Sequence, residues 1–243
     1  MNLKERFDKI QQNIAAAAVK SRRDARDVTL VAVTKNGTTD QIKQLVELGH
    51  RDFAESKVQQ LQQRAAQLDE WLLRQAGRTD KKMAAPGDIH WHMIGHLQRN
   101  KVRPVISICH AVHSVDSLRL AEEIQDEAER LQRITPVFLE VNVAGENSKF
   151  GVAVGASIHL AEQIDTMDNV HLVGVMCMAP YSANPEDARP VFVRLREIFE
   201  EIKFRKIGAD RFKHLSMGMS GDYQVAVEEG ATMVRIGSAL FGS

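Results

Sequence analysis

The first 20 residues carry apolar side chains at steps of three and four positions. Leu3, Phe7, Ile10, Ile14 and Ala18 follow this spacing, and polar or charged residues fill most of the positions between them. Side chains at such steps share one face of a helix. The pattern therefore predicts an amphipathic helix at the start of the chain.

Short apolar runs then alternate with helical patterns along the chain. The clearest run, at 28–33, lacks polar alternation, which is typical of a strand covered on both faces. Thr38 or Thr39 can cap the helix that follows, and Gly49 stands where that helix should stop. The predicted strands are 28–33, 51–54, 89–94, 111–115, 137–143, 170–178, 214–217 and 232–236. After the leading helix, helices are predicted at 38–48, 56–74, 97–108, 117–131 and 184–203, and a loop at 76–88.

Eight alternations within 243 residues indicate an α/β fold of the (β/α)₈ or TIM barrel type, with an extra N-terminal helix. Such barrels need about 250 residues, so one barrel uses almost the whole length. No change of composition marks a boundary. We therefore expect a single domain over residues 1–243.

Composition narrows the classes of partner. The chain has 32 Lys and Arg against 32 Asp and Glu, so it lacks the basic excess that nucleic-acid binding requires. No apolar run approaches the ~18 residues of a membrane span, and the start does not resemble a signal peptide. Cys109 and Cys177 lack the spacing of a disulfide framework or a zinc site and are expected to be buried thiols. We expect a cytoplasmic protein with no membrane or nucleic-acid partner.

The ends of the last two predicted strands indicate a phosphate site. In TIM barrels the active site lies at the C-terminal ends of the strands, and phosphate commonly binds after strands seven and eight. Here these strands are followed by SMGMSGD at 216–222 and RIGSALFG at 235–242. Both turns combine small residues with hydroxyls and can direct free N–H groups at an anion. The alternative is that the glycines only make tight turns, but their pairing at these two strands favours phosphate.

Lys35 stands at the end of the first strand, which neighbours the eighth when a barrel closes. After a wholly apolar strand we expect its amine to be poorly solvated, which lowers the pKa and leaves a neutral nucleophile. A lysine beside a phosphate site suggests an imine with pyridoxal 5′-phosphate (PLP). The alternative is a strand-end lysine that simply reaches solvent.

Several segments together resemble a known family. They are VAVTK at 31–35, WHMIGHLQRNK at 91–101, ENSK at 146–149, LSMGMS at 215–220 and VRIGSA at 234–239. In this order, over nearly the whole chain, they are similar to the pyridoxal phosphate homeostasis proteins, a family related to the barrel domain of bacterial alanine racemase. The resemblance implies that Lys35 binds PLP as an imine and that the protein acts in PLP homeostasis and supply without being an enzyme.

The resemblance also implies roles for other residues. Ser216, Gly218, Gly237 and Ser238 would hold the phosphate, and Arg235 would face the pyridine nitrogen. Because arginine does not give up its proton, that nitrogen would stay unprotonated and the ring would be a poor electron sink.

The resemblance also bears on four further positions. Asn142 and Met176, at the ends of strands five and six, would point toward the ring, with core packing as the alternative. Lys149 matches a family lysine associated with cofactor traffic. Ser56 stands where many members have asparagine, which puts a contact from that loop in doubt.

Two other functions would use some of the same residues. A PLP-dependent amino-acid racemase needs a second base, which the racemases take as a tyrosine from an additional domain; Tyr181 and Tyr223 fall in or beside predicted loops. A barrel enzyme acting on a sugar phosphate would share Lys35 but not the full set of motifs. We expect a monomer, with PLP-dependent apo-enzymes as partners.

His90, His92 and His96 invite comparison with a metal site. His90 and His92 share a strand face, but no acidic or third histidine partner stands at a fixed spacing. We therefore expect no bound metal.

Overall fold

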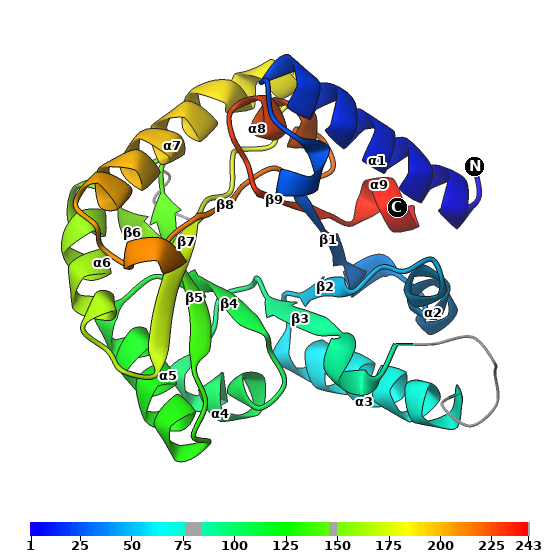
Figure 1. Ribbon diagram of the computed structural model, residues 1–243, viewed down its shortest axis with the longest axis horizontal. Helices are drawn as coiled ribbons and strands as arrows, with labels where there is room; N and C mark the ends of the chain where they lie inside the picture. The colour runs from blue at the N-terminus through cyan, green and yellow to red at the C-terminus, as the bar shows by residue number, and fades with distance from the viewer. Residues whose placement is uncertain (76–83, 146–149, 243) are drawn as a thin grey trace.

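Eight parallel strands form a closed barrel in the computed structural model, which describes residues 1–75, 84–145 and 150–242 (Figure 1). The order around the barrel is β4-β3-β2-β1-β9-β8-β7-β5, and pairing of β4 with β5 closes it. The strands are β1 (Thr29–Val33), β2 (Asp52–Glu55), β3 (His90–Met93), β4 (Ala111–Val115), β5 (Thr135–Asn142), β7 (Val170–Met176), β8 (His214–Ser216) and β9 (Met233–Ile236). A two-residue strand, β6 (Val152–Ala153), pairs with the end of β5. The predicted TIM-barrel fold is confirmed.

Helices surround the barrel (Figure 1). They are α1 (Leu3–Lys20), α2 (Thr39–Glu47), α3 (Val58–Gln75), α4 (Val102–Ile106), α5 (Leu118–Arg130), α6 (Ser157–Asp165), α7 (Arg189–Phe204), α8 (Tyr223–Glu228) and α9 (Ser238–Phe241). Within the described ranges, no helix combines the length and the apolar character that a membrane span requires.

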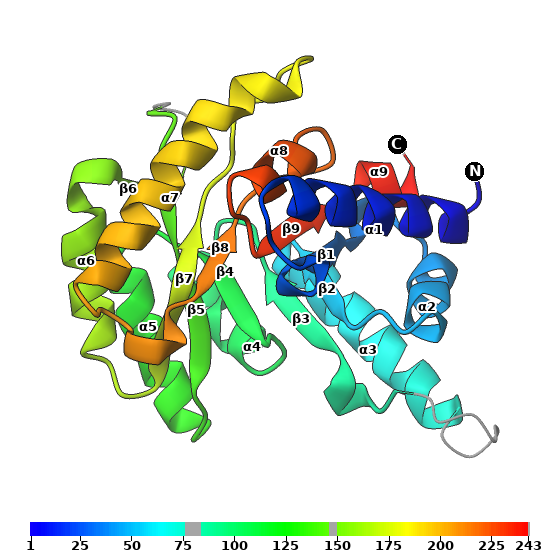
Figure 2. The ribbon, with the colours of Figure 1, turned by 45° about the horizontal axis from the view of Figure 1, so that its top comes forward.

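The extra N-terminal helix α1 lies alongside α8 and α9 (Figure 2). A capping box between Asn2 and Glu5 fixes where α1 begins, because each side chain accepts a bond from the other residue's backbone N–H. Ile10 and Ile14 on its apolar face are buried, and Arg6 donates to the Leu240 carbonyl at 2.7 Å. Helix α1 thus braces the two short helices that follow β8 and β9.

Four helices differ from the prediction. The helix expected at 97–108 is a 3₁₀ turn at Arg99–Lys101 followed by the short α4. A continuous helix would place the Pro104 ring against the carbonyl of Asn100, whereas Pro104 fits the first turn of α4. Helices α6, α8 and α9 were not among the predicted helices.

Apolar packing occupies both sides of the barrel wall. The large outer cluster joins the strands to the helices and includes both cysteines, which are buried and free as expected. Inside the barrel, Met176 packs with Ala111 and Phe138 in a separate small cluster. Met176 is therefore fully buried in the barrel interior.

Candidate functional site

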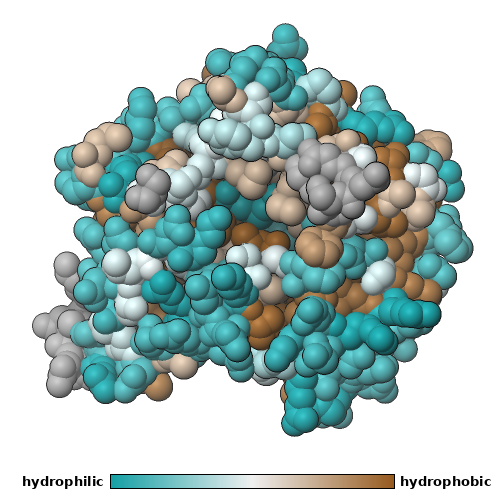
Figure 3. All heavy atoms as spheres, turned by 180° about the vertical axis from the view of Figure 1, so that it is seen from behind, coloured by the Kyte–Doolittle hydropathy of each residue, from teal (hydrophilic) through white to brown (hydrophobic). Residues whose placement is uncertain are grey.

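A cavity of about 640 Å³ opens at the C-terminal ends of the barrel strands. Figure 3 views this end, opposite to the one that faces the viewer in Figure 1, and shows a hollow near its middle where hydrophobic side chains lie among hydrophilic ones. The lining comes mainly from the segments that follow β1, β2, β3, β7, β8 and β9.

Lys35 lines this cavity from a 3₁₀ turn, Thr34–Asn36, directly after β1. Strand β1 pairs with β9, with Val31 opposite Arg235, so the predicted neighbourhood of the first and last strands is confirmed. Lys35 is exposed, however. The expectation of a poorly solvated amine is wrong, because the chain leaves the barrel wall at Val33 and carries Lys35 into the open mouth.

The turns after β8 and β9 meet at the cavity. The backbone N–H groups of Gly237 and Ala239 both donate to the Ser220 hydroxyl at 3.2 Å, so these two donors converge on one oxygen position. Gly218 has a φ of +92°, and a Cβ there would lie 2.5 Å from the Ala226 Cβ. Glycine is therefore required at 218 by both backbone conformation and space.

Arg235 reaches the cavity from β9 although only 3 % of the residue is exposed. Its Nη1 donates to the Ser216 hydroxyl at 2.7 Å and its Nη2 to the Cys177 carbonyl at 2.9 Å. Burial lowers the pKa of Arg235, and the nearby carboxyl groups of Glu140 and Asp222 act in the opposite direction. The guanidinium is thus a fixed, buried cation beside the cavity.

Glu140 is a buried carboxyl group in the cavity lining that the sequence did not single out. Burial and, to a lesser extent, the charge of Asp116 raise its pKa while Arg235 lowers it, and together they bring the pKa to about 7. A group with this pKa exchanges its proton near neutral pH. It lies within β5, and only the closed barrel brings it near Arg235.

The predicted site residues divide into two groups. Lys35, Arg235, Gly237 and Ser238 line one cavity, together with Ser56. The remaining predicted residues, Asn142, Met176, Ser216 and Gly218, are not in its lining. Lys149 lies outside the described residues.

Ser56 and Gly95 bring the segments after β2 and β3 into contact. A Cβ on Gly95 would lie only 2.2 Å from the Ser56 carbonyl oxygen, so no other residue fits without displacement of the backbone. The departure from asparagine at position 56 therefore falls on a residue that lines the cavity and touches its neighbouring loop.

Other lining residues were missed. Ser220 lies within the quoted motif at 215–220, and Tyr181 follows the sixth predicted strand, so the rule that sites form at the C-terminal ends of strands could have indicated both. His96 stacks on Phe150 with ring centroids 3.9 Å apart, and both line the cavity. That contact joins distant segments and leaves no local signal in the sequence.

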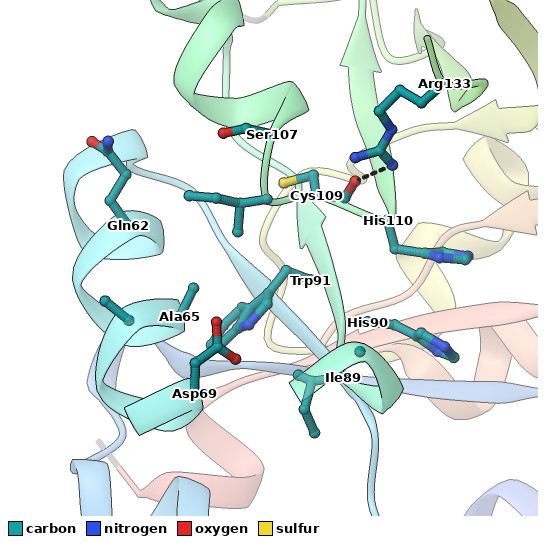
Figure 4. Close-up of a pocket in the computed structure, with 13 residues that line it drawn as sticks. Gln62, Ala65, Asp69, Ile89, His90, Trp91, Ser107, Cys109, His110 and Arg133 are labelled. Carbon is teal, nitrogen blue, oxygen red and sulfur yellow. Dashed lines mark hydrogen bonds between the residues drawn. The ribbon is translucent and has the colours of Figure 1, made fainter. Parts of the chain in front are cut away.

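His90 and His92 both hydrogen-bond to Asp52, at 3.1 and 3.3 Å. Within 1–75, 84–145 and 150–242, no group of three or more His, Cys, Asp or Glu side chains is arranged to hold a metal ion. His90 also lines a second hollow of about 410 Å³, where its ring lies beside that of His110 with centroids 4.5 Å apart (Figure 4). Among the described residues that line this hollow there is no lysine.

Comparison with known proteins establishes the family. A family model described as the N-terminal domain of alanine racemase matches residues 6–243. A curated protein of Aquifex aeolicus, named pyridoxal phosphate homeostasis protein, is 36% identical over 242 residues, covering 100% of this chain and 98% of that protein. The chain belongs to the pyridoxal phosphate homeostasis protein family. The resemblance found in the sequence motifs is thereby confirmed.

Solved structures of similar proteins agree with this membership of the pyridoxal phosphate homeostasis protein family. PipY of Synechococcus elongatus PCC7942, solved with PLP bound, is 28% identical with a TM-score of 0.80, covering 99% of this chain and 100% of that one. Alanine racemase of Clostridium difficile 630 is 14% identical with a TM-score of 0.72, covering 100% of this chain and 59% of that one. The second likeness shows the shared barrel fold alone.

Proposed function

We propose that this protein binds PLP as an imine with Lys35 and acts in PLP homeostasis and supply rather than as an enzyme. The observation that carries the proposal is that Lys35, Arg235, Gly237 and Ser238 reach one cavity. Its volume of about 640 Å³ lies within the ~300–1,000 Å³ common for small-molecule sites. The PLP-bound structure of PipY supports the same cofactor.

The chain's groups fit the two ends of PLP. Its aldehyde supplies an electrophilic carbon with which a neutral lysine amine condenses to an imine, with loss of one water. Lys35 is exposed in the cavity mouth, so its amine is accessible to an incoming aldehyde. The N–H groups of Gly237 and Ala239 converge on the Ser220 hydroxyl oxygen. Together with the Ser238 hydroxyl, they would donate hydrogen bonds to the phosphate.

Arg235 supports a role in holding PLP rather than in catalysis. Facing the pyridine nitrogen, the guanidinium would keep it unprotonated and so weaken the ring as an electron sink. The two tyrosines also disfavour a racemase. The Tyr223 hydroxyl accepts a hydrogen bond from the Asn13 side-chain amide at 2.8 Å, and Tyr181 is 95 % exposed. Tyr223 is therefore already engaged by Asn13, and Tyr181 is not fixed by packing as a second base would be. The curated relative is likewise named as a homeostasis protein.

The proposal is tested by adding PLP to wild-type protein and to two matched variants. Lys35→Ala removes the proposed nucleophile, whereas Lys57→Ala removes another lysine that lines the same cavity. We expect the visible absorbance band of bound PLP in wild type and Lys57→Ala and its loss in Lys35→Ala. Equal bands in all three proteins would overturn the assignment of Lys35.

Supply is tested separately from binding. Wild-type protein carrying PLP is mixed with a PLP-dependent apo-enzyme, and the activity gained by that enzyme is followed over time against the same concentration of free PLP. We expect activation by the loaded protein, with no racemase or transaminase turnover by the loaded protein alone. Robust turnover on an amino acid would instead support the racemase alternative.

A further inference from the structure

A chain of hydrogen-bonded side chains crosses the barrel interior from β2 to β9. The Asp52 carboxylate lies 3.3 Å from the His92 Nε2, and the His92 Nδ1 lies 2.9 Å from the His113 Nε2. The His113 Nδ1 lies 2.9 Å from the Ser216 hydroxyl, which accepts from Arg235 at 2.7 Å. His92, His113 and Ser216 have no exposed surface. The chain therefore connects one end of the barrel to the guanidinium beside the cavity.

With both imidazoles neutral, the two ends of this hydrogen-bonded series fix the direction of every bond in it. Arginine can only donate and an ionised carboxylate can only accept, while a neutral imidazole has one donor and one acceptor. If His92 donates from Nε2 to Asp52, its Nδ1 must accept from His113 Nε2. The Nδ1 of His113 must then accept the Ser216 hydroxyl proton. Both histidines carry their proton on Nε2, and each of these four bonds has one donor and one acceptor.

The surroundings of His113 favour its neutral form. Burial lowers the pKa of His113 well below its ordinary value, and the groups that face it, His92, Arg235, His214 and His110, act in the same direction because each is cationic when protonated. Its ring also stacks on Phe138, with centroids 4.0 Å apart, which fixes its plane. A neutral, oriented imidazole can hold the Ser216 hydroxyl in one rotamer.

We propose that His113 and His92, anchored on Asp52, are positioning residues that hold Arg235 through the Ser216 hydroxyl. This inference rests on the proposed function in that Arg235 is taken to face the PLP ring. It gives Ser216 a different task from the phosphate contact that the sequence suggested. The Ser216 hydroxyl donates a hydrogen bond to His113, and its oxygen accepts one from Arg235. The hydroxyl proton is therefore engaged beneath the cavity and is not available to a phosphate.

The first test needs no cofactor. Long-range ¹H–¹⁵N correlation spectra of the full chain, with His92→Gln and His113→Asn used for assignment, report which ring nitrogen carries the proton. At neutral pH we expect both histidines as Nε2–H tautomers. An Nδ1–H tautomer or a doubly protonated ring at either position would overturn the proposed chain, whatever the outcome for PLP binding.

The second test follows Arg235 through bound PLP. His113→Phe keeps the stack on Phe138 but removes both ring nitrogens, whereas His113→Asn keeps an acceptor near the Nδ1 position. We expect His113→Phe to raise the apparent Kd for PLP roughly tenfold, which corresponds to ~1.4 kcal/mol, and to shift the cofactor absorbance in the same direction as Arg235→Leu. His113→Asn should stay closer to wild type.

Ser216→Ala is the companion variant, because it removes one oxygen and keeps the volume of a small side chain. It should shift the cofactor absorbance as His113→Phe does. His171→Gln, which changes a histidine that takes no part in this series of hydrogen bonds, should leave the absorbance unchanged. Unchanged spectra in Ser216→Ala and His113→Phe, beside a shift in Arg235→Leu, would overturn the positioning role. Loss of the absorbance band of bound PLP in Lys57→Ala but not in Lys35→Ala would overturn the proposed function. The result for the histidine tautomers would be unaffected.

Discussion

Glu140 and Arg235 lie near each other beside the cavity but differ in how their charged forms are stabilised. Arg235 has bonds to Ser216 and to the Cys177 carbonyl, whereas Glu140 is buried with the charge of Asp116 nearby. Burial and Asp116 together outweigh the attraction of Arg235, which is why the pKa of Glu140 rises to about 7. Its charge therefore depends on pH in the range where the protein is handled.

The sign of the effect on stability follows from proton binding. Glu140 has a pKa near 4.5 when unfolded and about 7 when folded, so between these values the folded state binds more protons. Its contribution to stability is present below pH 4.5 and is lost as the pH rises through 7. The loss amounts to about 3 kcal/mol, since one pKa unit corresponds to ~1.4 kcal/mol.

Glu140→Gln should therefore stabilise the protein at pH 8 relative to wild type and have little effect at pH 5. Urea unfolding at the two pH values measures the difference in the free energy of unfolding. An equal effect of the substitution at both pH values would contradict the raised pKa.

At the scale of elements, the strands were more predictable than the helices. The eight strands of the barrel wall are short and largely buried, and apolar runs mark β1, β5 and β7 most directly. Helix α4 depends on Pro104, whose effect was missed, and α6 begins after Ala156, which makes no side-chain capping hydrogen bond that would mark its start in the sequence. The pattern of apolar residues was thus enough to predict the strands. The bounds of the helices also depended on single residues such as Pro104.

Gly95 offers a test of how closely neighbouring elements approach. Gly95→Ala places a methyl group where the Ser56 carbonyl oxygen lies 2.2 Å away, so the segments after β2 and β3 must separate. We expect a loss of about 1–3 kcal/mol in the free energy of unfolding, as for other overpacked sites, together with weaker PLP binding. Gly155→Ala, where nothing lies within 4 Å of the added Cβ, is the matched control. Equal stability of the two variants would contradict the close approach.

At the scale of the whole molecule, several histidines favour the neutral form. Burial lowers the pKa of His110 to about 4 and also lowers the pKa values of His50, His113 and His214. For such groups the unfolded state binds more protons between their folded pKa and 6.5, so stability falls as the pH drops through this range. Glu140 acts in the opposite direction over part of the same range.

The histidine effect should therefore be clearest in Glu140→Gln. In that background we expect the free energy of unfolding to fall by on the order of 2 kcal/mol between pH 7 and pH 5, and His113→Asn should reduce the fall. Thermal or urea unfolding across this range measures it. A free energy that stays flat from pH 7 to 5 would contradict the neutral, buried state of these rings.

The cavity itself was partly predictable because it follows a rule of whole barrels. Lys35 and the turns after β8 and β9 lie at the C-terminal ends of adjacent strands, where the order along the chain already placed them. The chain through His113 could not be predicted, since His113 and Ser216 stand 103 positions apart and meet only inside the closed barrel. The exposure of Lys35 likewise depends on where β1 ends.

Reduction with borohydride shows which lysine carries PLP. Wild-type protein saturated with PLP is reduced, digested and examined by mass spectrometry, with Lys57 in the same cavity as the internal comparison. We predict one pyridoxyl phosphate mark, on Lys35, and its absence from Lys35→Ala. A mark on Lys57 or on another lysine, with Lys35 unmodified, would contradict the account.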